Sequence, residues 1–236
     1  MFATEESLVR ASWQAFERVI SRLLIHEGFK DVRLVGQSHD RGADILAYGM
    51  GKRWLFQVKH WKQKTGVAVV DEVMQATMVY RSDVPVLVSL SGFDDAALEH
   101  QRVLLSRGMP LQLWDRAHIA RRIAQLAIND ELRHSPRPYQ EKAIQALIQS
   151  YLDEYCHKAL VVMATGLGKT FVAAEAIRRM GLVQPIRVMC IAHTNEIVHQ
   201  LERAFWPVIG SLQKTVVWNG YEHPDASELE SAPFLF

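Results

Sequence analysis

The segment MATGLGKT, residues 163–170, is the feature that most constrains the fold of this chain. It follows an apolar run that is typical of a buried strand, ALVVM at 159–163, and it opens a helical pattern at Lys169. A strand, a glycine-rich turn and a helix in this order predict the phosphate-binding loop of an α/β domain. Position 163 is methionine where the strict pattern has glycine, so a glycine-rich turn that binds nothing is the alternative.

Four residues of this loop are expected to hold a nucleotide. Gly166 and Gly168 let the backbone turn so that its N–H groups converge on the phosphates. Lys169 is placed to meet the β and γ phosphates, and the hydroxyl of Thr170 is placed to bind Mg²⁺. Because GKT stands at a helix start, the sequence favours ATP and Mg²⁺ as ligands of this half of the chain.

The chain divides at a polar stretch that contains two prolines. We expect a first domain at residues 1–128, a linker at 129–136 and a second domain at 137–236. The 236 residues, 49% hydrophobic and 22% charged, suit two globular domains. Two cysteines make no disulfide framework, no apolar run reaches the roughly 18 residues of a membrane span, and no hydrophobic leader opens the chain. We therefore expect a cytoplasmic protein without a membrane partner.

Both halves are predicted to be α/β. In the first, a helix and a hairpin are followed by alternating helices and strands, which predicts a mixed sheet. In the second, strands and helices alternate, which predicts a parallel sheet. The predicted helices are 13–24, 67–81, 94–107, 115–128, 138–152, 169–179 and 194–205, and the predicted strands are 32–35, 43–48, 53–59, 84–90, 110–114, 159–163, 187–192 and 215–218.

A quieter pattern in the first half joins an acid, an amide and a lysine. Gln57 and Lys59 lie on one face of a predicted strand, because alternate side chains point the same way. The hairpin turn at Gly49–Gly51 brings Asp44, at the start of the preceding strand, beside them. Carboxylate and amide oxygens are hard ligands for Mg²⁺, and a lysine beside the metal orients a water for phosphodiester hydrolysis.

Glu17 extends this pattern. It borders the apolar face of the helix 13–24, where an acid is costly unless a metal or a cation pairs with it. The alternative is an ordinary surface: a turn aspartate at position 44, solvent-facing side chains on the strand, and a Glu17 carboxylate paired with Arg18 or Arg22. Spacing alone favours that alternative.

A family resemblance reverses this preference. The stretch from Phe16 to Trp61, with its FE, GADI and QVK segments, resembles the Mrr-type restriction endonuclease domain, a branch of the PD-(D/E)xK nucleases. The resemblance extends over residues 13–126 and includes SLSGF at 89–93 and the segment 110–123. It implies a PD-(D/E)xK mixed-sheet fold, Mg²⁺ as cofactor and double-stranded DNA as substrate. It further implies Glu17 and Asp44 as metal-linked acids, Gln57 at the usual carboxylate ligand position, and Lys59 as the catalytic lysine.

Basic residues in the same half are candidates for contact with DNA. From Ile45 to Val70 the chain has no acid and five bases, Lys52, Arg53, Lys59, Lys62 and Lys64. Such a stripe can bind phosphates although the formal net charge is only +1; a solvated strand edge is the alternative. The interleaved His60, Trp61, Lys62 and Lys64 are equally compatible with a DNA contact and with an exposed turn, and His39 and Asp40 are further candidates.

The second half resembles superfamily 2 helicases, in particular the translocase subunits of restriction enzymes. RPYQEKAI at 137–144, MATGLGKT, and AHTNEIVHQ at 192–200 carry the resemblance. It implies a RecA-like domain in which Arg137 and Gln140 contact adenine with Tyr139 beside them. In the third segment, which lies along the nucleic-acid track of that family, Thr194 replaces the usual arginine.

The resemblance to helicases also implies sequence motifs and a domain that this sequence does not contain. No DExH or DEAD run follows Thr170, and the second RecA-like domain of the family is absent. We therefore expect a piece of a longer protein, or a truncated gene product, that binds ATP weakly, hydrolyses it poorly and does not move along DNA.

Together these patterns predict a Mg²⁺-dependent DNA endonuclease of type II- or IV-like class. In an intact parent it would be coupled to an ATP-driven translocase in restriction or phage defence. A DNA-targeting module that does not cut and an ATP-sensing module that binds a protein partner are the alternatives. Many nucleases act as homo-oligomers, and no sequence feature here decides the oligomeric state.

Overall fold

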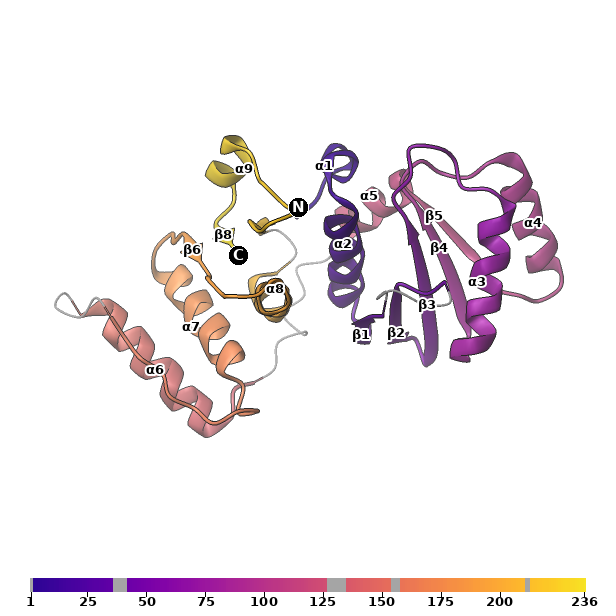
Figure 1. Ribbon diagram of the computed structural model, residues 1–236. Helices are drawn as coiled ribbons and strands as arrows, with labels where there is room; N and C mark the ends of the chain where they lie inside the picture. Colours follow the sequence, from indigo (N-terminus) through magenta and orange to yellow (C-terminus); the bar gives the residue numbers. More distant parts are fainter. Residues whose placement is uncertain (1, 36–41, 127–134, 154–157, 211–212) are drawn as a thin grey trace. The chain divides into compact units, whose positions relative to one another are not determined.

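The computed structural model describes residues 2–35, 42–126, 135–153, 158–210 and 213–236 (Figure 1). The chain forms two compact units. One contains Ala3–Leu126, and the other contains Ala127–Phe236 together with the first two residues. None of the helices in these described ranges is long and apolar enough to cross a membrane.

The first unit is a five-stranded mixed sheet between helices (Figure 1). The strands stand in the order β1-β2-β3-β4-β5; β1 to β3 form an antiparallel meander, and β4 and β5 continue the sheet in parallel. This is the mixed sheet expected from the sequence. Its elements are α1 (Glu5–Arg10), α2 (Trp13–His26), β1 (Lys30–Leu34), β2 (Ile45–Gly49), β3 (Lys52–Lys59), α3 (Val67–Tyr80), β4 (Val84–Ser89), α4 (Asp95–Ser106), β5 (Gln112–Asp115) and α5 (Arg116–Gln125).

Strands β3 and β4 form the buried centre of this sheet. Every residue of β4 is buried, because β4 lies between β3 and β5 and helices cover both faces of the sheet there. Leu55 and Leu87 pack under α3 and α4. On the opposite face, the rings of Phe56 and Trp114 lie 5.4 Å apart. Strand β3 therefore contributes side chains to the core on both faces of the sheet.

A tight turn fixes the register of β2 against β3. Met50 and Gly51 both adopt left-handed backbone conformations, with φ angles of 53° and 72°. Two such residues between paired strands form the hairpin turn whose twist matches the strands. Tyr48 pairs with Arg53 and Ile45 with Phe56. The hairpin expected at Gly49–Gly51 is confirmed.

The second unit contains a small parallel sheet and four helices among its described residues. The strands stand in the order β6-β8-β7. Rings of Phe205, Phe234 and Phe236 meet edge to face in its core. The elements are α6 (Pro138–Leu152), α7 (Lys169–Val183), β6 (Val188–Met189), α8 (Asn195–Ile209), β7 (Thr215–Val216), α9 (Ala226–Ser231) and β8 (Phe234–Leu235).

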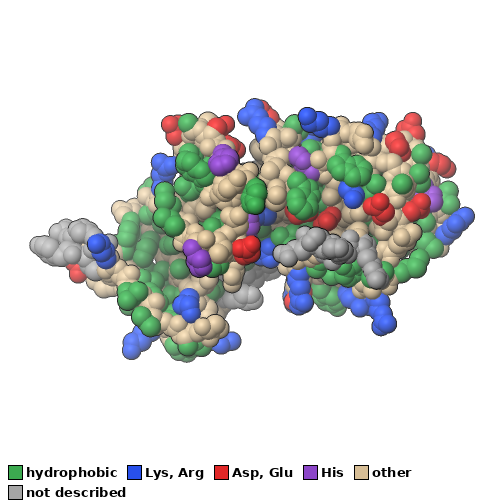
Figure 2. Space-filling view, in the orientation of Figure 1, with side chains coloured by type: hydrophobic (Ala, Val, Ile, Leu, Met, Phe, Trp, Pro, Cys, Tyr) green, Lys and Arg blue, Asp and Glu red, His purple; other side chains and the backbone are tan. Residues whose placement is uncertain are grey.

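One strand prediction in this unit is wrong and one strand was missed. Residues 159–163 form no strand, whereas Phe234–Leu235 forms the central strand β8. The reason is pairing, since a strand exists only where a neighbour accepts its hydrogen bonds. Leu160 and Val162 are 88% and 84% exposed, and Figure 2 shows hydrophobic side chains at the surface of this unit. An apolar run indicates a preference for burial, but it does not determine whether another strand pairs with it.

Candidate functional site

Asp44 is held against β3 at the end of the hairpin. Its backbone N–H donates to the carbonyl of Phe56 at 2.9 Å, and its Oδ2 accepts from the N–H of Val58 at 2.6 Å. Since Ile45 pairs with Phe56, the register places Asp44 opposite Gln57. The structure therefore brings together the acid and the strand residues that the sequence pattern joined.

Glu17 lies on α2 and is only 8% exposed. Burial, and then the negative charge of Asp44, raise the pKa of its carboxyl to about 8. Within the described residues, its Oε1 has no hydrogen-bond partner. A carboxyl group whose ionisation is disfavoured by burial and by a neighbouring acid, and an unsatisfied buried oxygen, are features that a bound cation would relieve.

Gln57 and Lys59 share a partner that the sequence did not reveal. Gln57 is 2% exposed, and its Nε2 donates to Oε2 of Glu72, on α3, at 3.2 Å. The Nζ of Lys59 lies 3.6 Å from the same Oε2 and 5.1 Å from the ring centre of Trp61. Glu72 was missed because its helix reads as apolar packing; the only available signal was the acid pair with Asp71 inside that run.

The residues present fit a hard divalent cation. The buried Oε1 atoms of Glu17 and Gln57 both lack a hydrogen-bond partner among the described residues. Carboxylate and amide oxygens are ligands that Mg²⁺ accepts, with water completing its shell. Within the described ranges, no group of three or more His, Cys, Asp or Glu side chains is placed to hold a metal. A cation here would therefore need the amide oxygen of Gln57 beside the two acids.

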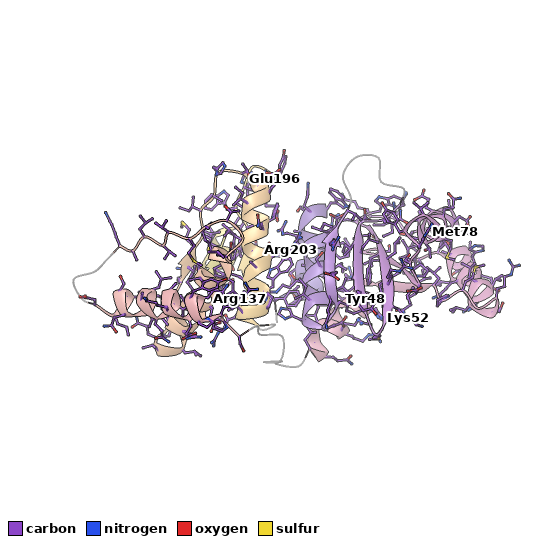
Figure 3. All side chains as sticks on the ribbon, turned by 90° about the horizontal axis from the view of Figure 1, so that it is seen from below. Tyr48, Lys52, Met78, Arg137, Glu196 and Arg203 are labelled. Atoms are coloured by element: carbon purple, nitrogen blue, oxygen red, sulfur yellow. The ribbon has the colours of Figure 1, made fainter. Side chains whose placement is uncertain are left out.

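The basic stripe is divided by the strand that carries it. Lys52 and Arg53 begin β3, and Figure 3 shows Lys52 near Tyr48 at the hairpin. Lys59 ends β3, about 23 Å away at the usual rise per residue, and Lys62 and Lys64 follow it as exposed side chains. Only the second group accompanies Asp44 and Gln57.

The remaining candidates near this site have different surroundings. Trp61 is 40% exposed, whereas the His60 ring packs 5.6 Å from that of Phe16, and burial lowers the pKa of His60. His60 is thus partly a core side chain rather than part of a fully exposed turn. His39 and Asp40 lie outside the described residues.

The glycine-rich loop of the second unit has the backbone that a phosphate loop needs. Gly166 and Gly168 have φ angles of 83° and 82°, which other residues adopt only with strain. Thr170 lies in the first turn of α7. The Nζ of Lys169 contacts the carbonyls of Met163 and Ala164 at 3.0 and 3.2 Å, so its ammonium lies over the loop.

The segment before this loop packs against it. Gln140 donates from Nε2 to the carbonyl of Leu167 at 3.0 Å, and its Oε1 accepts from the N–H of Arg137 at 2.9 Å. A Cβ at Gly168 would lie 2.7 Å from Nε2 of Gln140. The structure therefore packs Gln140 against the predicted phosphate loop, with Arg137 bonded to Gln140.

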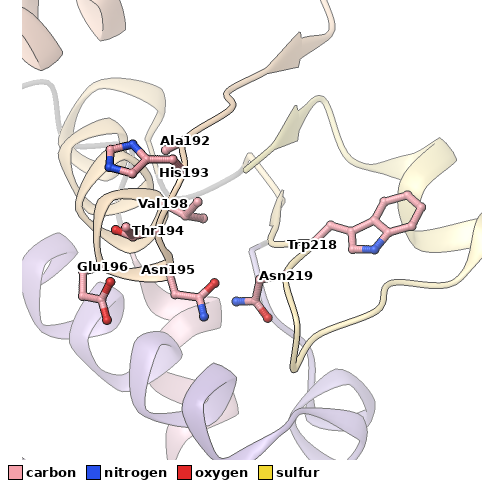
Figure 4. Close-up of a pocket in the computed structure, with 8 residues that line it drawn as sticks. All are labelled: Ala192, His193, Thr194, Asn195, Glu196, Val198, Trp218 and Asn219. Carbon is pink, nitrogen blue, oxygen red and sulfur yellow. The ribbon is translucent and has the colours of Figure 1, made fainter.

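The segment at 192–200 lines a cavity of about 380 Å³ in the second unit (Figure 4). Thr194 caps α8, with its Oγ1 accepting from the N–H of Ile197 at 3.3 Å. Figure 4 shows Asn195 and Asn219 pointing toward one another. The cavity is lined by Ala192, His193, Thr194, Asn195, Glu196, Val198, Trp218 and Asn219.

Comparison with protein families accounts for almost the whole chain. Residues 8–123 match the restriction endonuclease family of the Mrr type, and residues 133–233 match the family of the type III restriction enzyme res subunit. The chain joins a restriction endonuclease domain to a helicase-like domain. This confirms both resemblances and the two-part α/β fold expected from the sequence.

One curated relative is much longer than this chain and only distantly similar to it. The chain is 24% identical over 233 residues to the type I restriction enzyme EcoAI endonuclease subunit of Escherichia coli. The match covers 89% of this chain and 28% of that subunit.

Two solved structures are similar at a low level. One is the ATP-dependent type ISP restriction-modification enzyme LlaBIII bound to DNA: TM-score 0.40, identity 14%, with 91% of this chain and 15% of that chain covered. The other is a protein of unknown function, AF1548: TM-score 0.36, identity 15%, with 70% of this chain and 96% of that chain covered.

Proposed function

We propose that the first domain, residues 1–128, is a Mg²⁺-dependent endonuclease that hydrolyses phosphodiester bonds of double-stranded DNA. One observation carries the proposal. In a restriction endonuclease domain, a buried glutamate, whose ionisation the neighbouring Asp44 disfavours, and a buried amide each present an oxygen that lacks a hydrogen-bond partner within the described residues. A buried oxygen without a hydrogen-bond partner destabilises the folded chain unless a ligand binds to it.

The proposal assigns a role to each side chain. Glu17, Asp44 and Gln57 would hold Mg²⁺, which when bound polarises a phosphate and acidifies a water. Asp44 is fixed to the backbone of β3, so its carboxylate needs little reorganisation to bind. Lys59, at the end of the same strand, supplies an ammonium that orients the attacking water and stabilises charge on the phosphate oxygens.

The DNA backbone would be bound beside this site. Trp61, Lys62 and Lys64 are exposed and follow Lys59 directly, so their cationic and aromatic groups are available to phosphates and sugars. Lys52 and Arg53, at the other end of β3, could bind only a separate part of the duplex.

In the second domain, residues 137–236, we propose an ATP site that operates in a larger protein. Gly166, Gly168, Lys169 and Thr170 would bind the phosphates and Mg²⁺, with Arg137 and Gln140 toward the base. The chain spans 28% of the curated relative that it matches, an endonuclease subunit of a type I restriction enzyme. Restriction or phage defence, with a translocase acting on the same DNA, is the cellular role that we infer.

Plasmid cleavage tests the nuclease. The full chain is incubated with Mg²⁺ and no ATP, on methylated and unmethylated plasmid, beside Asp44→Ala, Lys59→Ala and the control Lys30→Ala, an exposed lysine of β1. We expect wild type and control to cut, as a type II- or IV-like enzyme would, and the two site variants to lose about 100-fold or more.

The same experiment separates the competing functions. Cutting that is insensitive to both site substitutions would refute the assigned site. Failure of all proteins to cut, with binding retained in a gel shift, would instead identify a DNA-targeting module.

A further inference from the structure

Glu72 occupies a position that connects two of the proposed site residues. It stands on α3, in a different element from all the residues that the sequence pattern joined, and its Oε2 receives Nε2 of Gln57 at 3.2 Å and Nζ of Lys59 at 3.6 Å. Gln57 is 2% exposed, whereas the Glu72 side chain is 54% exposed. An exposed carboxylate thus reaches inward to a buried amide.

This contact decides which end of the Gln57 amide is free to bind a cation. A side-chain amide carries a donor end and an acceptor end of nearly equal shape. An ionised carboxylate only accepts, so Glu72 takes the NH₂ group and leaves Oε1 on the other side. That oxygen is buried and has no hydrogen-bond partner within the described residues. Without an acceptor at Glu72, the amide could rotate and present its NH₂ group to the cation.

The contacts that α3 makes with the core do not require an acid at position 72. The residues of this helix that enter the core are Val69, Val70, Val73 and Ala76. The neighbouring Asp71 pairs instead with Nε2 of His100 on α4, at 3.1 Å. Adjacent acids on one helix therefore have separate partners, and only Glu72 contacts the proposed site.

We propose that Glu72 is a positioning residue of the nuclease: it orients the Gln57 amide so that Oε1 faces a divalent cation, and it holds the Lys59 ammonium beside it. This inference rests on the proposed function. It also explains why an amide suits position 57 here. A carboxylate at that position would lie about as close to Glu72 as the present 3.2 Å contact, and two ionised acids would repel each other.

The test is a charge exchange between the two positions. The variants of the full chain are Glu72→Ala, Gln57→Glu, Gln57→Glu with Glu72→Gln, and the control Asp71→Ala. Each is titrated with Mn²⁺ by electron paramagnetic resonance, without ATP and relative to Asp44→Ala, and with Mg²⁺ in plasmid cleavage. Circular dichroism establishes that each variant is folded.

We expect Glu72→Ala to weaken cation binding about 10- to 100-fold, as loss of a hydrogen-bond partner behind a metal ligand does, while Asp71→Ala binds like wild type. The double variant should recover much of the affinity lost in Gln57→Glu, because its introduced amide can donate to the introduced carboxylate. A purely structural role for Glu72 would give no such recovery.

Two results would overturn the inference: unchanged cation binding in Glu72→Ala, or a double variant no better than Gln57→Glu. If either occurs while wild type cuts and Asp44→Ala does not, the nuclease stands and only the role of Glu72 fails. If the Mn²⁺ pattern is as expected but no protein cuts, the positioning role stands and the proposed nuclease activity fails.

Discussion

Replacing Glu17 with glutamine should stabilise the protein in EDTA, and increasingly so as the pH rises. The carboxyl has a pKa of about 8 in the folded chain against 4.5 for an unperturbed glutamate. Between these values the folded state keeps a proton that the unfolded state has released, so stability falls as pH rises. The contribution of Glu17 is fully present below pH 4.5 and is lost as the pH passes through about 8.

The size of the effect follows from the same two pKa values. From pH 6 to pH 8 the wild-type protein should lose at most about 2 kcal/mol that the glutamine variant keeps. This is a large fraction of the usual stability of a domain, roughly 5–15 kcal/mol. With saturating Mg²⁺ the order should reverse at pH 8, because a bound cation stabilises the carboxylate and an amide replaces it poorly.

The assay must report on the first domain alone. Urea unfolding is followed by pulsed hydrogen exchange and mass spectrometry on peptides from β3 and α3, at pH 6 and pH 8, with EDTA or with Mg²⁺. The control is Glu99→Gln, an exposed acid of α4 that pairs with Arg102 at 3.0 Å. Equal pH slopes for wild type and Glu17→Gln in EDTA would refute the argument that burial and Asp44 hold this proton.

Two further predictions concern stability and nucleotide binding. Arg122→Ala should destabilise the first domain by about 2 kcal/mol in the same exchange assay. Arg122 donates to both carboxylate oxygens of Glu27 at 2.8 Å, and its guanidinium lies 4.2 Å from the centre of the Trp114 ring. An unchanged midpoint of urea unfolding would count against a stabilising role of these contacts. Lys169→Ala should weaken binding of a fluorescent ATP analogue about tenfold or more, with Lys158→Ala as the control, since Lys169 is the cation of the proposed phosphate loop. Equal affinity of the two variants would refute the proposed ATP site.

Local sequence patterns predicted most of the first domain, because the structure that each segment favours by itself is also the structure that it adopts in the folded domain. The period of two on 53–59 placed Gln57 and Lys59 on one face, and the turn at Gly49–Gly51 placed Asp44 opposite Gln57. Strand β4 was identified from its continuous apolar run, and the structure covers both of its faces. In each case the same residues set both the local geometry and the burial.

The second domain shows where this reasoning fails. The run 159–163 has the composition of a strand, yet in the structure it forms none, because β6 and β7 pair with Phe234–Leu235 instead. Hydrogen-bond partners of a parallel strand come from distant segments, so composition cannot name them.

The sequence by itself determined which candidate groups the chain carries: a glycine-rich loop before a helix, an amide and a lysine at strand spacing, and an acid on the preceding strand. Only the tertiary structure decided the surroundings of those groups. It buried Glu17 beside Asp44, which raises the pKa of Glu17, and it brought Glu72 from α3 to Gln57 and Lys59. Spacing along one strand fixes the direction of its side chains, whereas burial and charge depend on elements that the chain brings together only when it folds.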